Sequence, residues 1–312
     1  MHEEVTIPEL TEVVARLSAL LGPRTGGVEP LEGGLTNRNF RVNFGGNDYV
    51  VRLPGKRTEL LGIDREAECV ATKAAAELGI GPNVAAMLKS PPCLVTCFIS
   101  GREMTPEEVA DPAELIGVAQ SLRAFHDSGT DLSTTFDSFE LVDEYAELAR
   151  ENGVDPPERF DSARAHAQRI REAIAGHDEH RPVPCHDDLL TANFLHDGER
   201  VQIIDWEYAG MGDRYFDLGN FAVNNELDDD TGDALLEAYF GEPPDARRRA
   251  TLGLMRFMSD FREAMWGVVQ TAVSDLDFDF VDYATKHFER MSDTAADPRF
   301  AGRLEEARAA NG

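Results

Sequence analysis

The chain has 312 residues, of which 42% are hydrophobic and 28% are charged, which is typical of a folded globular protein and argues against a largely disordered one. The 58 acidic residues outnumber the 30 basic ones and give a net charge of −28. Because such a surface repels phosphate backbones and anionic lipids, we expect no nucleic-acid partner and no membrane-surface role. The sequence also has no apolar run of the roughly 18 residues that a membrane helix needs, and no signal-peptide pattern at its acidic start.

The charged residues have an unusual composition. Only Lys56, Lys73, Lys89 and Lys286 are lysines, while aspartate and glutamate are spread along the whole chain. Dispersed acid with scarce lysine predicts a halophilic protein, because concentrated salt screens the repulsion among carboxylates. The alternative is an ordinary acidic cytosolic protein.

The four cysteines, Cys69, Cys93, Cys97 and Cys185, contain no CxxC pair and do not form a metal or disulfide framework. A chain of this length needs no disulfides to be stable. We therefore expect reduced cysteines and a cytoplasmic protein.

The first hundred residues contain both strand and helix patterns. Gly45-Gly46-Asn47-Asp48 lies between two strand-like runs and predicts a hairpin. The predicted elements are a helix over 8–21, strands over 39–44 and 49–53, a helix over 64–78 and a strand over 94–99.

The rest of the chain is mainly helical by its apolar spacing, apart from a strand-like run at Val201–Ile204. The predicted helices cover residues 106–127, 139–151, 158–176, 231–240, 245–272 and 279–291. Arg247–Arg249 is expected to be a solvated helix face, and the residues after about 295 are expected to fray. A β-rich first part and a helical second part predict two lobes that meet near Ser100, with a ligand cleft between them.

The first chemical motif is LEGGLTNRNFRV, from Leu31 to Val42. Gly33-Gly34 would let the backbone approach a ligand closely, and Thr36 and Asn37 could donate hydrogen bonds to phosphate oxygens. The alternative is a plain turn between two strands.

Arg52 lies at the end of the next strand-like run, and Glu68 lies in the helix that follows. A strand cation held by a helix carboxylate can bind a polyphosphate. The alternative is an ordinary salt bridge.

The second motif is CHDDLLTANFLHDGERVQIIDWEYAG, from Cys185 to Gly210. Asp188 and Asn193 are five residues apart, and Asp205 directly follows the apolar Val201–Ile204 run. Their carboxylate and amide oxygens are hard ligands of the kind that Mg²⁺ takes together with substrate phosphates. Asp188 could then orient and deprotonate a hydroxyl that attacks a γ-phosphorus. We expect His186 to brace this loop through hydrogen bonds.

HDDLLTAN followed by IDWEYA resembles the catalytic loop and the metal aspartate of the choline/ethanolamine kinase family, which is related to the aminoglycoside kinases. The resemblance covers most of the chain. GGLTNRNFRV is similar to the family's nucleotide loop, YVVRLPG to its phosphate-binding strand, YFDLGNFA to the segment after the metal aspartate, and MWGVVQTAVSDLDFDFVDYATKHF to its C-terminal helices.

The resemblance implies a bilobal protein-kinase-like α+β fold, with a nucleotide-binding lobe over residues 1–100 and a catalytic and substrate-binding lobe over 101–312. It also implies ATP and Mg²⁺ as cofactors. Carried over position by position, the implied catalytic base is Asp188, the implied Mg²⁺ ligands are Asn193 and Asp205, and the implied nucleotide site comprises Gly34, Asn37, Arg52, Glu68 and the adenine-stacking segment Cys97, Phe98 and Ile99.

The family holds choline in an aromatic cage with carboxylates, because a quaternary ammonium is bound by ring faces and charge. Tyr208, Trp266 and Tyr283 stand at matching positions, although Trp266 as core packing is the alternative. Eukaryotic members carry a glutamate where this chain has Asn224, and a tryptophan where it has Glu263. The missing carboxylate is therefore replaced by Glu263 or by Glu226.

The predicted function is transfer of the γ-phosphoryl group of MgATP to the hydroxyl of a small amino alcohol, choline or ethanolamine. One alternative is a related kinase for an aminoglycoside, thiamine or another metabolite alcohol. A degenerate nucleotide-binding regulator is the non-enzymatic alternative, and it is disfavoured because Asp188, Asn193 and Asp205 are all present.

Overall fold

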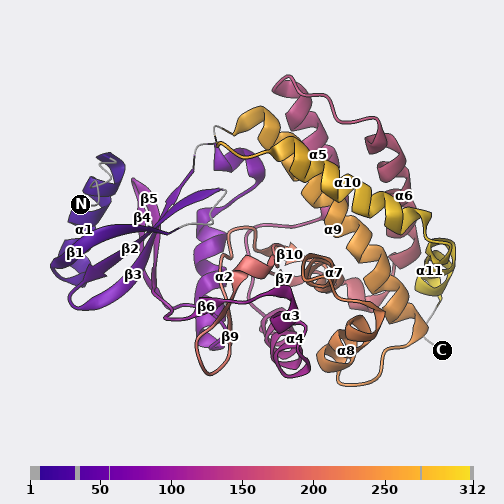
Figure 1. The fold of residues 1–312 in the computed structure, drawn as a ribbon, viewed down its shortest axis with the longest axis horizontal. Helices are drawn as coiled ribbons and strands as arrows, with labels where there is room; N and C mark the ends of the chain where they lie inside the picture. The colour runs from indigo at the N-terminus through magenta and orange to yellow at the C-terminus, as the bar shows by residue number, and fades with distance from the viewer. Residues whose placement is uncertain (1–7, 32–35, 56, 275, 310–312) are drawn as a thin grey trace.

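The computed structural model describes residues 8–31, 36–55, 57–274 and 276–309. A β-sheet occupies one end of the molecule and most of the helices gather at the other (Figure 1). This arrangement confirms the predicted α+β class. Gly34 and Lys56 lie outside the described residues.

The main sheet has five antiparallel strands in the order β1-β2-β3-β5-β4. The strands are β1 (Arg24–Leu31), β2 (Asn37–Phe44), β3 (Asn47–Pro54), β4 (Val84–Lys89) and β5 (Pro92–Cys97). The predicted hairpin is confirmed as β2–β3, with Gly45 and Gly46 at positive φ in its turn. The strands β1 and β4 were missed, because two glycines and a proline weaken the strand pattern of β1 and two alanines that of β4.

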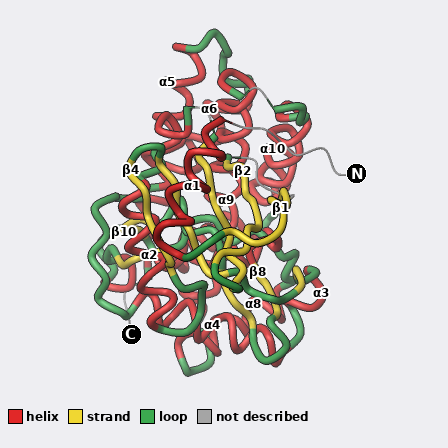
Figure 2. The backbone as a smooth tube through the Cα atoms, turned by 90° about the vertical axis from the view of Figure 1, so that its left-hand side faces the viewer, coloured by secondary structure: helices red, strands yellow, loops and turns green. Residues whose placement is uncertain are grey.

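Helix α1 (Pro8–Leu21) covers one face of this sheet (Figure 2). Its Leu10, Val13 and Leu17 are buried against sheet residues such as Phe40 and Val51. The helix pattern predicted over 8–21 is therefore confirmed, and its apolar stripe forms a small core of its own with the sheet.

Helix α2 (Arg65–Glu77) begins at Asp64, whose carboxylate accepts hydrogen bonds from the amides of Glu66 and Ala67. Its Ala71 and Ala75 belong to the large core of the helical part rather than to the sheet core. Glu68, on the same helix, forms an ion pair with Arg52 of strand β3. The helix thus joins the two parts of the molecule beside the predicted phosphate-binding pair.

The helical part is built around α9 (Ala246–Val273), which packs against α5, α7, α10 and α11. The other helices there are α3 (Pro106–Val109), α4 (Pro112–His126), α5 (Ser138–Glu151), α6 (Arg159–Ile174), α7 (Arg214–Asn224), α8 (Asp229–Phe240), α10 (Phe280–Ala296) and α11 (Arg299–Arg308). Five short strands lie between these helices: β6 (Arg102–Glu103), β7 (Val183–Cys185), β8 (Phe194–His196), β9 (Val201–Ile203) and β10 (Gly210–Gly212).

Two helix predictions differ from the structure. The helix predicted over 106–127 is broken in two, because Asp111 caps α4 and Pro112 takes its first turn. Helix α7 was missed, since Asp217, Gly219 and Asn220 interrupt its apolar pattern. A Cβ atom at Gly219 would lie 2.7 Å from the backbone of Met255, so the glycine allows α7 to approach α9 closely.

The prediction of a fraying C-terminal segment was wrong. Residues Arg299–Arg308 form α11, in which Phe300, Leu304 and Ala307 are buried against the helical core. The prediction of a solvated Arg247–Arg249 face was also wrong in part, because Arg247 is buried. Its alkyl stem packs inside while its guanidinium pairs with Glu179 at 3.0 Å.

Glu179 receives three charged or polar partners: Arg247 at 3.0 Å, Arg248 at 2.9 Å and the Tyr215 hydroxyl at 2.6 Å. Burial acts to raise the pKa of Glu179, but these partners outweigh it and lower the pKa from 4.5 to about 2. The stabilisation is therefore fully present above pH 4.5 and is lost as the pH falls through about 2.

We expect Glu179→Gln to lower the free energy of unfolding at neutral pH by at most about 3 kcal/mol. The measurement is urea unfolding of both proteins between pH 6 and 3. The difference between them should stay constant down to about pH 4.5 and shrink below it. A difference that does not depend on pH would contradict the charge-based explanation.

None of the four cysteines is in a disulfide, and Cys69, Cys93 and Cys185 are buried. The predicted free thiols are thus confirmed. Across the described residues, no helix combines the length and the apolarity that a membrane crossing requires.

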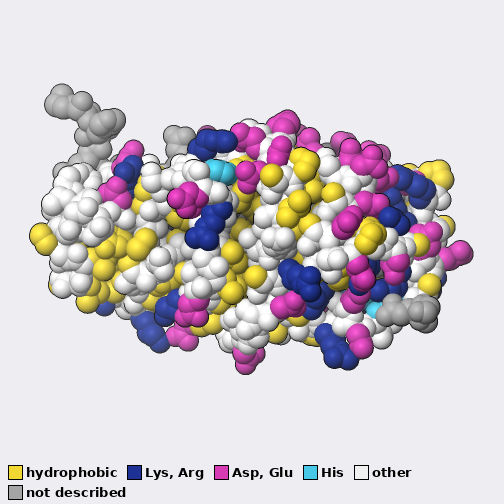
Figure 3. Space-filling model, turned by 90° about the horizontal axis from the view of Figure 1, so that it is seen from below, with side chains coloured by type: hydrophobic (Ala, Val, Ile, Leu, Met, Phe, Trp, Pro, Cys, Tyr) yellow, Lys and Arg dark blue, Asp and Glu magenta, His cyan; other side chains and the backbone are white. Residues whose placement is uncertain are grey.

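One face of the molecule carries acidic side chains interspersed with basic ones over most of its length (Figure 3). Exposed ion pairs such as Arg38–Glu9 and Arg299–Asp229 contribute only about 0–1 kcal/mol each, and there are too few basic residues to pair every acid. Repulsion among the surplus acids therefore dominates the electrostatics of the surface.

We expect the melting temperature to rise as potassium chloride increases from about 0.1 M towards 1 M, because the Debye length falls from about 10 Å to about 3 Å. Thermal unfolding monitored by circular dichroism measures this directly. The gain should shrink near pH 4, where the carboxylates are partly protonated. A melting temperature that stays flat or falls in salt at pH 7 would contradict the halophilic prediction.

Candidate active site

The predicted catalytic loop leaves β7 at Cys185 and ends in the 3₁₀ turn Thr191–Asn193. His186 braces it as predicted: its Nε2 donates to the Ile204 carbonyl oxygen at 2.9 Å, and its Nδ1 accepts from the Asp188 amide at 3.2 Å. Burial lowers the pKa of the imidazole, so the ring is neutral. Both ring nitrogens are engaged by backbone groups, so His186 fixes the backbone of the loop.

Helix α7 braces the same loop from the other side. Asp217 accepts hydrogen bonds from the amides of His186 at 2.8 Å and Asp187 at 2.7 Å, and Asn220 accepts from the amide of Leu189. These positioning residues were not predicted, although the DLGN sequence placed two polar side chains one helical turn apart within an apolar run. Such a spacing is the signal that could have identified them.

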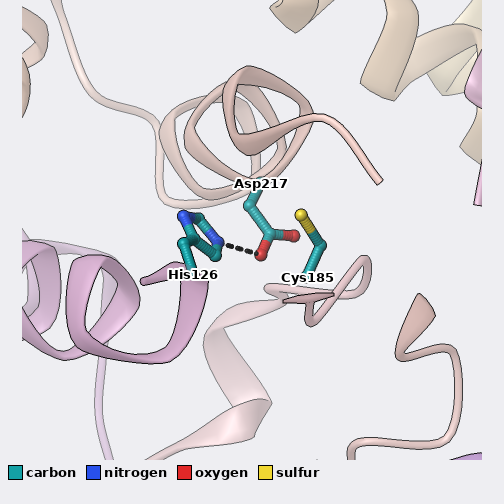
Figure 4. Close-up of side chains that lie close together, drawn as sticks. All are labelled: His126, Cys185 and Asp217. Atoms are coloured by element: carbon teal, nitrogen blue, oxygen red, sulfur yellow. Dashed lines mark hydrogen bonds and ion pairs between the residues drawn. The ribbon is translucent and has the colours of Figure 1, made fainter. Parts of the chain in front are cut away.

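Asp217 also lies beside His126 and Cys185, in a fully buried group (Figure 4). His126 Nε2 is 2.9 Å from Asp217, and His126 Nδ1 is 2.6 Å from the Tyr239 hydroxyl. Both oxygens of Asp217 already accept N–H groups, so hydrogen bonding alone explains the cluster. His126 is the last residue of α4, and its contacts with Asp217 and Tyr239 connect α4 to α7 and α8.

The structure brings Asp188, Asn193 and Asp205 to one region. The Asn193 side-chain amide donates to the Asp188 carbonyl oxygen at 2.8 Å, and the Ile204 amide donates to the Asn193 carbonyl oxygen at 3.0 Å. Burial raises the pKa of Asp188 well above its usual range. The Arg262 cation opposes this rise, and the Asp205 carboxylate adds to it. Asp205 has a φ of 66°, a left-handed conformation that turns the chain sharply after β9.

Arg52 and Glu68 form the predicted ion pair, with 2.9 Å between Nη1 and Oε1. The same guanidinium also contacts the Asp205 carboxylate, so the strand cation reaches from the sheet to the helical part. Glu68 is almost fully buried, and Arg52 is 13% exposed at its side chain. A buried pair that still faces an opening is what a polyphosphate site requires.

Arg65 and Glu207 extend this network, and neither was predicted. Arg65 contacts Glu68 at 2.8 Å and Glu207 at 3.2 Å, while the Asn37 amide donates to Glu207 at 2.7 Å. Burial and the nearby Asp205 raise the pKa of Glu207 to about 7, against the charges of Arg65 and Arg52. Glu207 could have been identified from the sequence by its position directly after the tryptophan of the IDWE motif.

A cavity of about 420 Å³ lies between the sheet and the helical part. Six residues of the predicted site line it: Arg52, Glu68, Cys97, Phe98, Ile99 and Asp205. The amides of Cys97 and Phe98 already donate to the carbonyl oxygens of Asn83 and Asp48. Asn37 instead lines a second cavity of about 690 Å³ on the other side of the Arg65–Glu68 contact.

The four predicted acceptor residues come together from three elements. The Trp266 indole N–H donates to the Tyr208 hydroxyl at 2.8 Å, and the Tyr283 hydroxyl donates to Glu263 at 2.7 Å. Trp266 and Tyr283 also pack edge to face, with 5.5 Å between ring centroids. Glu226 is exposed, whereas Glu263 is buried inside this cluster.

Arg262 joins the acceptor cluster to Asp188 and was not predicted. Its Nη1 is 2.7 Å from Glu263 and 3.4 Å from Asp188, and only 1% of its side chain is exposed. The sequence signal for Arg262 was the Arg262-Glu263 pair among the apolar residues of the long helix α9. Charged residues are seldom buried without a specific partner.

Comparisons with known proteins agree with this geometry. Residues 27–252 match the phosphotransferase enzyme family. A solved structure of a choline/ethanolamine kinase family protein from Mesorhizobium loti is 32% identical and superposes with a TM-score of 0.82 over 96% of this chain and 99% of that one. Protein LicA of Haemophilus influenzae is 25% identical over 268 residues, which are 82% of this chain and 76% of LicA. Mouse ethanolamine kinase 2 is 28% identical over 270 residues, which are 77% of this chain and 68% of the relative.

The sheet, the helical part and the braced loop define a bilobal protein-kinase-like α+β protein. The chain belongs to the phosphotransferase enzyme family and, within it, to the choline/ethanolamine kinases. It is accordingly an enzyme that transfers a phosphoryl group to an alcohol.

Proposed function

We propose that the protein is an ATP-dependent kinase that phosphorylates the hydroxyl of choline or ethanolamine. The observation that carries this proposal is the cavity of about 420 Å³, which has Arg52 and Glu68 on its sheet side and Asp205 on its helical side. Arg52 supplies the guanidinium that would bind phosphate oxygens there, because Glu68 and Asp205 hold it in place while it still faces the opening.

In this proposal residues 1–100 form the nucleotide-binding lobe and residues 101–312 form the catalytic and acceptor-binding lobe. Arg52, positioned by Glu68, holds the phosphates. The segment Cys97–Ile99 forms the wall against which adenine stacks. Gly34, which lies outside the described residues, is assigned to the nucleotide site from the sequence motif alone. The relatives named as kinases support the use of a nucleotide.

The donor set of Asn193 and Asp205 fits Mg²⁺. The nitrogen of the Asn193 amide is engaged by the Asp188 carbonyl oxygen, so its oxygen points the other way and is the ligand atom. Asp205 supplies a carboxylate that is 20% exposed at its side chain. When bound, Mg²⁺ would neutralise phosphate charge. The Asn193 amide oxygen, the Asp205 carboxylate and the substrate phosphates are all oxygen ligands, which Mg²⁺ prefers.

Asp188 performs the proton step. The acceptor hydroxyl oxygen forms the new bond to the γ-phosphorus, the bond to the bridging oxygen of ADP breaks, and the hydroxyl proton passes to the Asp188 carboxylate. Asp217 accepts from the Asp187 amide and Asn220 from the Leu189 amide, so the backbone is held on either side of Asp188 and its carboxylate keeps its place during the reaction.

Tyr208, Trp266, Tyr283 and Glu263 bind the amino end of the acceptor. They lie within one contact network that reaches Asp188 through Arg262, which supports an acceptor bound with its hydroxyl towards the proposed base. A cytoplasmic location belongs to the same proposal, because its free thiols and its nucleotide substrate suit a reducing compartment.

The proposal is tested by incubating the purified protein with radiolabelled ATP, Mg²⁺ and one acceptor at a time: choline, ethanolamine, thiamine or an aminoglycoside. We expect label transfer to choline or ethanolamine. Transfer to thiamine or to an aminoglycoside alone would replace the proposed acceptor and keep the kinase. Absence of transfer to any of them, with ATP bound, would favour a nucleotide-binding regulator.

A further inference from the structure

Arg262 occupies the place in the acceptor cluster that a bound cation would need. Its guanidinium carbon lies 4.4 Å from the centre of the Tyr208 ring, which is within the range of a cation–π contact. The same guanidinium lies 5.8 Å from the centre of the Phe136 ring, in the segment between α4 and α5. The ring face that Tyr208 would offer to an onium group is therefore covered by a cation of the chain itself.

The other two rings of the cluster are also engaged. Trp266 packs edge to face against Phe280 at 5.8 Å and against Tyr283 at 5.5 Å, and its indole N–H binds the Tyr208 hydroxyl. Only 5% of Trp266 is exposed. A trimethylammonium group cannot donate hydrogen bonds and depends on open ring faces, so this cluster offers it little.

The charges at the same place favour a cation that carries N–H groups. Glu263 and Asp188 are two carboxylates around the single guanidinium of Arg262, which gives this group a net charge of −1 when all three are ionised. Carboxylate oxygens accept hydrogen bonds, and a primary ammonium has three donors to offer them. A second cation is therefore held here by hydrogen bonds rather than by ring faces.

We propose that Arg262 determines the acceptor, so that the enzyme selects an alcohol with a primary ammonium over one with a quaternary ammonium. This inference rests on the proposed kinase function and narrows its acceptor from two amino alcohols to the ethanolamine type. Each N-methyl group removes one donor and adds bulk beside Arg262, so kcat/KM falls along the series from ethanolamine to choline.

The test measures kcat/KM with ethanolamine, its N-methyl and N,N-dimethyl derivatives, and choline, at saturating MgATP. For the natural sequence we expect ethanolamine to exceed choline by about 10-fold or more, the discrimination that the loss of one hydrogen bond to a charged group can provide. Arg262→Met, which keeps the length and removes the charge, should reduce that ratio at least several-fold. Arg262→Lys, which keeps the charge, should retain the preference.

The ratio of the two acceptors is the readout, because Arg262 also contacts Asp188 and its loss lowers kcat for every acceptor. If Arg262→Met does not fold, Arg262→Gln, which removes the charge but keeps N–H donors for the buried Glu263, should show the same change of ratio. Folding is checked by circular dichroism and the nucleotide site by the KM for ATP.

A natural protein that uses choline as well as ethanolamine, or better, would overturn the inference and leave the proposed kinase intact. An unchanged ratio in both uncharged variants would also overturn it, because Arg262 would then not determine the acceptor. Failure to phosphorylate any member of the series would instead reject the proposed function, and the inference with it.

Discussion

Asp188→Asn should lower kcat by about 10²–10⁴ while the protein still folds and binds MgATP, since that factor is typical of a positioned acid–base group. Asparagine has nearly the same shape and cannot take up the hydroxyl proton. The hydrogen bonds that the Asp188 amide donates to His186 and that the Asp188 carbonyl oxygen accepts from Asn193 involve main-chain atoms, so they are kept. The measurement is steady-state kinetics with the acceptor identified by the label-transfer screen.

The matched control is Asp187→Asn, the same change one residue earlier. Burial, together with the neighbouring Asp217 carboxylate, raises the pKa of Asp187 well above its usual range, and asparagine is the neutral residue closest to it in shape. Its main-chain amide, which donates to Asp217, is unaffected. Near-full turnover in Asp188→Asn, or an equal loss in the two variants, would reject Asp188 as the base.

Asp205→Ala should weaken the binding of ATP in the presence of Mg²⁺ by about 100-fold or more, because it removes the only charged member of the proposed metal ligands. The fold should survive, since Arg52 keeps its contact with Glu68 at 2.9 Å. Isothermal titration calorimetry with ATP, with Mg²⁺ and with EDTA, separates the metal from the nucleotide.

For the natural protein, EDTA should reduce ATP affinity to nearly the level of Asp205→Ala. The variant itself should respond little to EDTA, and it should bind metal-free ATP at least as well as the natural protein does, because one negative charge facing the phosphates is gone. A variant that keeps the full response to Mg²⁺ would show that the metal is held elsewhere.

Elements with a strong local pattern were predicted well. Helix α1 has a regular apolar stripe, and helix α2 has an N-terminal cap at Asp64. The β2–β3 hairpin has glycines in its turn. Strand β1 and helix α7 were missed because what stabilises them is not local. β1 is a strand because it pairs with β2, and α7 is a helix whose polar residues face the catalytic loop.

The amino-acid sequence by itself determined which residues form the proposed catalytic centre. The HDDLLTAN and IDWEYA motifs place Asp188, Asn193 and Asp205 close along the chain, so a short loop and one turn after β9 bring them together. Local spacing was enough, because few conformations of so short a segment exist and His186 selects among them.

Only the tertiary structure decided which cations and carboxylates meet across the molecule. The contact of Arg52 with Asp205 joins residues 153 positions apart, and that of Arg262 with Asp188 joins residues 74 positions apart. Such partners depend on how α9 packs against the catalytic loop and how the sheet sits on the helical part. Burial then makes these contacts specific, because a charge removed from water must find a partner of opposite sign within the fold.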